Sequence, residues 1–108
     1  MSLFWDPDAI VPRQLAPGVM AKIASGEKVM LSLVTLAPGA VVPEHAHPHE
    51  QMGMLVSGAM ELTVSGQART LSGNAIYLVP GGVLHKAVAG PEGAVALDVF
   101  SPPREEYR

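Results

Sequence analysis

The chain has 108 residues, of which 48% are hydrophobic, and its formal net charge is −3. This length fits one domain, which we expect to span residues 1–108, and the apolar content excludes a disordered polar chain. The sequence has neither clustered Lys and Arg nor an apolar run near the roughly 20 residues of a membrane span, so neither nucleic acid nor a membrane is an expected partner.

The N-terminal residues 1–11 lack both a basic opening and an apolar core, so we expect no signal peptide and a cytoplasmic protein. Phe4 and Trp5 in this segment are expected to pack it onto the domain rather than to bind a sugar. The chain has no cysteine, which excludes disulfides and thiolate ligands. A metal ion would therefore need nitrogen and oxygen ligands.

Short segments rich in Val, Leu, Ile, Met and Thr alternate with Gly and Pro turn signals, a pattern typical of an all-β sandwich or barrel. No segment carries an apolar stripe of helical period over three turns. In chain order the expected strands are Val19–Ala24, Val29–Leu36, Val41–His47, Gln51–Val56, Met60–Val64, Arg69–Leu71, Ala75–Leu78, Lys86–Ala89 and Ala94–Phe100. Residues 102–107 are expected to form an extended tail or one helical turn.

Two of these strands differ in how their faces are patterned. Residues 60–65 alternate between apolar and polar side chains, which predicts one buried and one wet face. Residues 51–56 carry Met52 and Met54 on one face and apolar or specialised residues on the other. If one face lines a barrel, the other needs a cover. That cover is either a second subunit, which predicts a homodimer, or another sheet of the same chain.

The four histidines lie in two places, three within residues 44–51 and the fourth at position 85. Residues i and i+2 of a strand point to the same side, so His45 and His47 can direct two imidazoles at one point. Gln51, which opens the next strand, and His85 from a distant strand would complete a shell of three nitrogens and one oxygen. A shell with open positions is the pattern of a reactive metal site.

Two neighbouring residues are alternative ligands. His49 is a ligand if Gln51 is not, and is otherwise a rim or solvated residue. Glu50 is the carboxylate nearest the expected oxygen position, but its parity is wrong for the strand that follows. The alternative to a metal site is that the His-x-His pair lies in a solvated loop and binds nothing.

These residues form two spaced motifs. The pattern Gly39-x5-His45-x-His47-x3-Gln51-x6-Gly58 resembles the first motif of the cupin family, and Gly73-x6-Pro80-x-Gly82-x2-His85 resembles the second. The resemblance implies a double-stranded β-helix, the cupin jelly-roll barrel, holding one divalent metal ion (Ni, Zn, Fe or Mn). The usual Glu ligand is Gln51 here, and Ala89 replaces an Asn that often closes the second motif. A neutral amide leaves the site near +2, so the metal is a stronger electrophile and hard cations are held less firmly.

The C-terminal segment 98–107 is similar to the ending of the KdgF-like small cupins, which promote ring opening of the unsaturated uronates left by pectin and alginate degradation. This resemblance implies metal-ligand roles for His45, His47, Gln51 and His85. It also implies functional roles for Asp98, Phe100 and Arg104, with Asp98 and Arg104 catalytic and with Phe100 and Arg104 in contact with the substrate.

The residues themselves leave alternatives open. Asp98 lies in the apolar segment 94–100, where an unpaired carboxylate is costly to bury. It is therefore a structural hydrogen-bonding residue, a residue at the wet end of the strand, or a general acid or base beside the metal. Arg104 is either a solvated tail residue or a bidentate clamp for a substrate carboxylate.

Four functional hypotheses follow. The first is an isomerase- or lyase-type enzyme that opens the ring of an unsaturated uronate, with the metal polarising an oxygen of the sugar. The second is another metal-dependent isomerase, lyase or dioxygenase. The third is a non-catalytic sugar or metal sensor, and the fourth is a barrel that has lost its metal.

Overall fold

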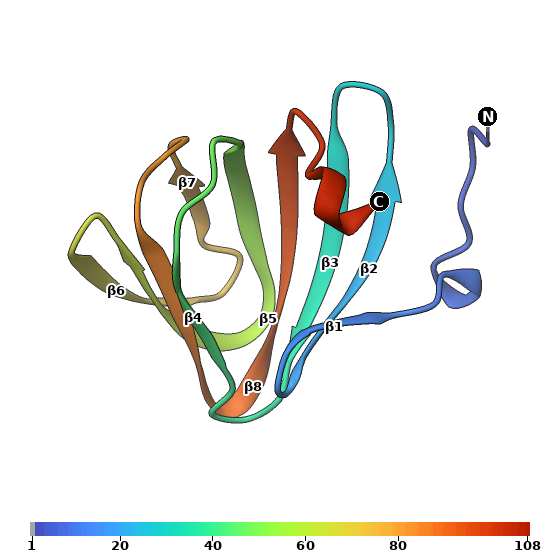
Figure 1. Cartoon of the computed structure of the whole chain (residues 1–108). Coiled ribbons are helices and arrows are strands. Elements are labelled where there is room, and N and C mark those ends of the chain that lie inside the picture. Colours follow the sequence, from blue (N-terminus) through green and yellow to red (C-terminus); the bar gives the residue numbers. More distant parts are fainter. Residues whose placement is uncertain (1) are drawn as a thin grey trace.

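The computed structural model describes residues 2–108 as a strand-rich chain with two short 3-10 helices (Figure 1). The strands are β1 (Arg13–Ala16), β2 (Val19–Ser25), β3 (Met30–Leu36), β4 (Val41–His45), β5 (Glu50–Val64), β6 (Gln67–Ser72), β7 (Ile76–Val79) and β8 (His85–Ser101). The 3-10 helices are η1 (Pro7–Ala9) and η2 (Glu105–Tyr107). No helix among residues 2–108 is long and apolar enough to cross a membrane.

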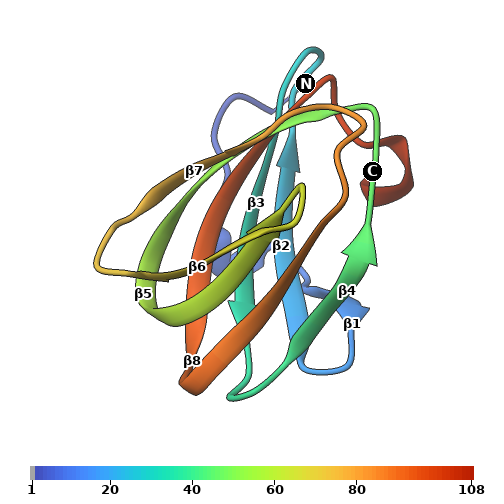
Figure 2. The ribbon, with the colours of Figure 1, turned by 90° about the vertical axis from the view of Figure 1, so that its left-hand side faces the viewer.

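The strands form one antiparallel sheet that curls into a cup-shaped barrel (Figures 1 and 2). Its main path runs β1-β2-β3-β8-β5-β6, while β4 pairs with β8 and β7 pairs with β5. The expected all-β class is thereby confirmed. Strand β1 was not predicted, because its four residues show neither alternation nor β-branched side chains.

Strands β5 and β8 are long, bent strands that join the two walls of the barrel. The first part of β8 pairs with β4 and the end of β5, and the second part pairs with β3 and the start of β5. The prediction of two separate strands in each of these regions was wrong. Gly58 and Gly93 have φ of +76° and +79°, and a Cβ at Gly58 would overlap the Gly93 carbonyl. These glycines let the strands bend and bulge while the ladder continues.

The apolar core lies on the inner faces of the strands, and part of it borders the barrel cavity. Alternation along residues 60–64 has the expected result, since Met60 and Leu62 are buried and Glu61 is exposed. The buried apolar cluster contains Val19, Ala21, Val34, Leu36, Leu55, Met60, Leu62, Leu71, Ala87, Ala89, Ala94 and Ala96.

The two chain ends behave differently. The expected packing of Phe4 and Trp5 onto the domain is wrong, because their side chains are 90% and 47% exposed. The Asp6 carboxylate accepts a hydrogen bond from the backbone N–H of Asp8 at 3.0 Å, and this local turn leads the segment away from the barrel (Figure 1). The C-terminal segment instead forms η2, and its Tyr107 lines the barrel cavity.

Candidate metal centre and ligand cavity

Three histidines from different parts of the chain meet inside the barrel. His45 ends β4, His47 lies in the loop before β5, and His85 opens β8, where it is the register partner of His45. Their candidate ligand atoms all lie within 4.8 Å of one another. His47 and His85 are buried and His45 is half-buried. This three-histidine cluster can hold one metal ion, as the spacing of the residues predicts.

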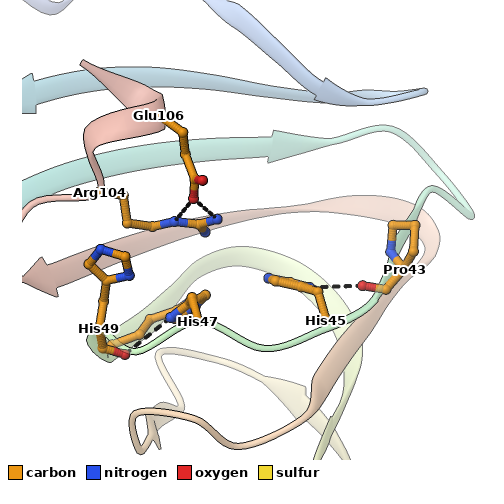
Figure 3. A network of polar contacts seen from close by, with 7 residues as sticks. Pro43, His45, His47, His49, Arg104 and Glu106 are labelled. Carbon is orange, nitrogen blue, oxygen red and sulfur yellow. Dashed lines mark hydrogen bonds and ion pairs between the residues drawn. The ribbon is translucent and has the colours of Figure 1, made fainter.

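The backbone sets the orientation of all three rings. The Nδ1 atoms of His45, His47 and His85 lie 2.8, 3.1 and 2.9 Å from backbone carbonyl oxygens of residues 43, 49 and 83 (Figure 3 shows the first two). A carbonyl only accepts, so each Nδ1 carries the proton and each Nε2 keeps its lone pair. Such outer hydrogen bonds are typical of histidines that ligate metals.

The electrostatics of the cluster favour neutral imidazoles. Burial, with Arg104 and His85 nearby, lowers the pKa of His47 from 6.5 to about 4. Burial also lowers the pKa of His85. The Nε2 atom of His85 is buried and has no hydrogen-bond partner within the described chain. Because a buried acceptor without a partner is costly, this atom fits a bound cation.

Gln51 places its amide oxygen against the cluster. Its Oε1 lies 3.1 Å from His47 Nε2, and its side chain also contacts Asp98. If the amide NH2 donates to the Asp98 carboxylate, Oε1 faces His47 Nε2 with a lone pair on each atom. Two acceptors facing each other in a buried site are relieved by a cation between them. The donor set of three imidazole nitrogens and one amide oxygen suits Ni, Zn, Fe or Mn.

Asp98 lies on the interior face of β8, so it is not at a wet strand end. It is buried, and its Oδ1 accepts a hydrogen bond of 2.6 Å from the hydroxyl of Tyr77 on β7. Burial raises the pKa of Asp98 above its usual range, while contacts from Tyr77 and Gln51 act in the opposite direction. Burial thus favours the protonated form of this carboxyl group more than water does, which is the environment of a candidate acid or base.

Arg104 is also buried, so it is not a solvated tail residue. Its guanidinium lies 4.1 Å from the Tyr107 ring centroid and 5.4 Å from that of Phe100. Its Nε donates to Glu106 at 2.8 Å, and its Nη2 contacts the same oxygen (Figure 3). Aromatic stacking and the ion pair hold the guanidinium at the barrel cavity with one flank against Glu106.

One cavity of about 310 Å³ connects these groups. It is lined by His45, His85 and Gln51, and also by Asp98, Phe100 and Arg104. Its volume is at the lower end of the range for small-molecule sites, about 300–1,000 Å³. All the site residues predicted from the sequence, except His47, therefore line one cavity. His47 does not line the cavity itself but belongs to the three-histidine cluster beside it.

The two alternative ligands lie outside the cluster. The ligand atoms that lie together are those of His45, His47 and His85. His49 is half-buried in the loop before β5, and Glu50 is exposed at the start of β5. Sequence reasoning missed Tyr77 and Tyr107. The sequence signal for Tyr77 was its place in the short strand after Gly73. It lies two residues before the buried Val79, and residues two apart in a strand share a face, so Tyr77 is expected on the interior face.

Comparison with known proteins agrees with this geometry. The sequence profile of the Cupin domain family matches residues 32–100. The pectin degradation protein KdgF of Dickeya dadantii (strain 3937) is 30% identical over 96 residues, which cover 87% of each chain.

Solved structures give the same result. KdgF from Halomonas sp. superposes with a TM-score of 0.91 at 31% identity, over 100% of both chains. An RmlC-like cupin from Shewanella frigidimarina NCIMB 400 superposes with a TM-score of 0.93 at 27% identity, over 100% of this chain and 97% of the other. The expected double-stranded β-helix is confirmed, and the chain belongs to the cupin family.

Proposed function

We propose that this chain is a metal-dependent isomerase-type enzyme that opens the ring of an unsaturated uronate to give the linear keto acid. One observation carries the proposal: a cavity of about 310 Å³ is shared by the three-histidine cluster, a buried carboxylate and a buried guanidinium. A small anionic ligand with oxygen atoms to bind and a proton to transfer matches these groups. Similarity to the pectin degradation protein KdgF supports the choice of a uronate.

The first part of the proposal is binding and orientation. One divalent ion, held by His45, His47, His85 and Gln51, would supply Lewis-acid polarisation of a sugar oxygen when bound. Arg104 holds the ligand carboxylate with the guanidinium N–H groups that Glu106 leaves free, and Phe100 packs against the ring of the ligand. Because Arg104 is already fixed by stacking and by its ion pair, little side-chain entropy is lost on binding.

The second part is proton transfer by Asp98. Ring opening removes a proton from the anomeric hydroxyl while the ring carbon–oxygen bond breaks, which leaves an aldehyde and an enolate. The enolate becomes a ketone when one proton is added to carbon, so the reaction is an isomerisation that needs no oxidant. The Asp98 carboxylate accepts the first proton and the carboxylic acid returns one, a dual role that its raised pKa favours.

The test is turnover of 4,5-unsaturated galacturonate by the metal-loaded protein, followed by loss of the ultraviolet absorbance of the ring. We expect Asp98→Asn to lower kcat by about 10²–10⁴-fold, the usual contribution of a positioned acid or base. The matched control is Glu61→Gln, an exposed carboxylate on the outside of β5, which should leave turnover unchanged. No turnover by the wild type, or full turnover by Asp98→Asn, contradicts the proposal. Binding of the uronate without chemical change identifies a sensor instead.

We also propose that the active form is a homodimer in which a second copy covers the outer face of the sheet. Leu31, Val99, Met52 and Leu78 are register partners across β3, β8, β5 and β7, and they are 37–52% exposed. No other segment within residues 2–108 covers this apolar outer row, which disagrees with burial beneath a sheet of the same chain. An exposed apolar face can pair with itself around a two-fold axis.

Light scattering after size exclusion tests the dimer. Wild type should have twice the chain mass, and Met52→Lys should shift it to one chain mass. Val41→Lys, which places the same charge on the exposed face of β4, is the control. A wild-type monomer refutes the dimer. The cytoplasmic location and a single domain over residues 1–108 remain predictions from the sequence.

A further inference from the structure

A row of positions that includes three polar residues crosses the interior of the barrel, next to the row that contains Gln51. Ser32, Asp98, Gly53 and Tyr77 are register partners on the adjacent strands β3, β8, β5 and β7. We call these four residues the polar row. The neighbouring interior row on one side is Val34, Ala96 and Leu55, and the row on the other side is Met30, Phe100, Gln51 and Val79. Ser32, Asp98 and Tyr77 of this row line the ligand cavity, and Gln51 is the one polar residue in the two neighbouring rows.

Two members of the polar row satisfy each other. The Tyr77 hydroxyl donates to Asp98 Oδ1 at 2.6 Å across strand β5. This contact is possible because Gly53 lies between them: a Cβ there would overlap both Asp98 Oδ1 and the Tyr77 phenol. Tyr77 therefore uses its one proton on Asp98 and has none left for a ligand.

Ser32 is the unsatisfied member of the polar row. Its side chain lines the cavity and is 1% exposed, and its Oγ has no hydrogen-bond partner among the residues that the structure describes. Leaving a buried hydroxyl unpaired costs about 1–3 kcal/mol. The other inward positions of β3 are Met30, Val34 and Leu36, so an apolar residue would be the stable choice here.

Ser32 also stands directly beside the Asp98 carboxylate. Cross-strand partners have Cβ atoms about 4.5–5.5 Å apart, so one small group can touch both side chains. A ligand hydroxyl is complementary to this pair, since it donates to the Asp98 carboxylate and accepts from the Ser32 hydroxyl. A ligand methylene would leave both groups unpaired, which is costly in a buried site.

We propose that Ser32 and Asp98 together bind one hydroxyl group of the ligand, which makes Ser32 a specificity-determining residue for polyhydroxylated acids. The inference rests on the proposed function for its ligand class, since it takes the ligand to be a sugar acid. In this arrangement Ser32 contacts the ligand directly. Gly53 has no side chain, and this leaves room for the Tyr77 hydroxyl to hold Asp98 in place.

The test is a binding measurement that needs no turnover. Calorimetry on the metal-loaded protein compares D-galacturonate with its 2-deoxy and 3-deoxy forms. Wild type should bind one deoxy form about 5- to 10-fold more weakly than galacturonate, the factor expected for one hydrogen bond. Ser32→Ala should bind galacturonate more weakly by a similar factor and should no longer discriminate against that deoxy form.

Two controls separate binding from folding. Ser32→Ala should keep or raise Tm, because it removes an unpaired buried hydroxyl. Ser57→Ala makes the same chemical change at an exposed position of β5 and should leave every affinity unchanged. Unchanged galacturonate affinity in Ser32→Ala, a lowered Tm, or no binding of galacturonate by the wild type overturns the inference. Binding with the expected pattern but without turnover of the unsaturated uronate supports Ser32 and refutes only the proposed reaction.

Discussion

Replacing Gly53 by alanine tests the packing on which the polar site depends. In a strand interior, alanine is ordinarily more stable than glycine by roughly 0.5–1 kcal/mol. At Gly53 the added Cβ would overlap Asp98 Oδ1 and the Tyr77 phenol. Overpacking costs about 1–3 kcal/mol. Loss of a hydrogen bond to a charged acceptor costs about 1.5–3 kcal/mol more.

We therefore expect Gly53→Ala to lower the free energy of unfolding by about 2–5 kcal/mol. For a domain of this size that corresponds to a Tm lower by at least about 10 °C. Urea and thermal unfolding measure both quantities. Gly26→Ala is the matched control, because its new Cβ would meet its nearest atom, the Val29 carbonyl oxygen, at an ordinary 3.4 Å. If the Gly53→Ala protein is as stable as wild type, the Tyr77–Asp98 hydrogen bond does not pass over this residue as described.

Three further predictions concern the charged and ligating groups. Arg104→Lys keeps the charge but loses the planar fork, so KM for the unsaturated uronate should rise about tenfold with little change in kcat; an unchanged KM would remove Arg104 from carboxylate binding. Gln51→Glu adds a negative ligand, so calorimetry should find tighter Mn²⁺ binding, and equal affinity would argue against Gln51 as a ligand. In metal-free protein the folded-state pKa of His47 is about 4 against 6.5 unfolded, so the unfolded state binds the proton more readily. Its contribution to stability is complete above pH 6.5 and is lost between pH 6.5 and 4, and His47→Gln should flatten this part of the Tm profile.

The metal ligands were predictable because their chemistry is visible in local spacing. His45 and His47 are separated by one residue at the end of a strand, and that spacing alone predicts two imidazoles on one side. His85 follows its own Pro-x-Gly turn, and the resemblance to the second cupin motif joined it to the first pair. Because the chain has no cysteine, these histidines were the main candidates for the ligands of a metal site.

The long-range relations of the fold were not predictable in the same way. The sequence predicted strand ends near Gly58 and Gly93, because a glycine interrupts the hydrophobic alternation of a strand both at a turn and at a bend within one strand. Only the approach of β5 to β8 decides between the two, and that contact joins residues far apart in sequence. Ser32 gave no signal either, since an isolated serine in a strand is ordinary until its burial and its missing partner are seen.

The central claim is that one metal ion sits among His45, His47, Gln51 and His85, and an anomalous-scattering map tests it most directly. Crystals grown from protein purified without chelator and measured at the Ni, Zn, Fe and Mn edges identify both the element and its position. The account predicts one peak per chain, about 2.0–2.2 Å from the three Nε2 atoms and from the amide oxygen. A peak elsewhere in the barrel, or none after loading with each of the four metals, would contradict it.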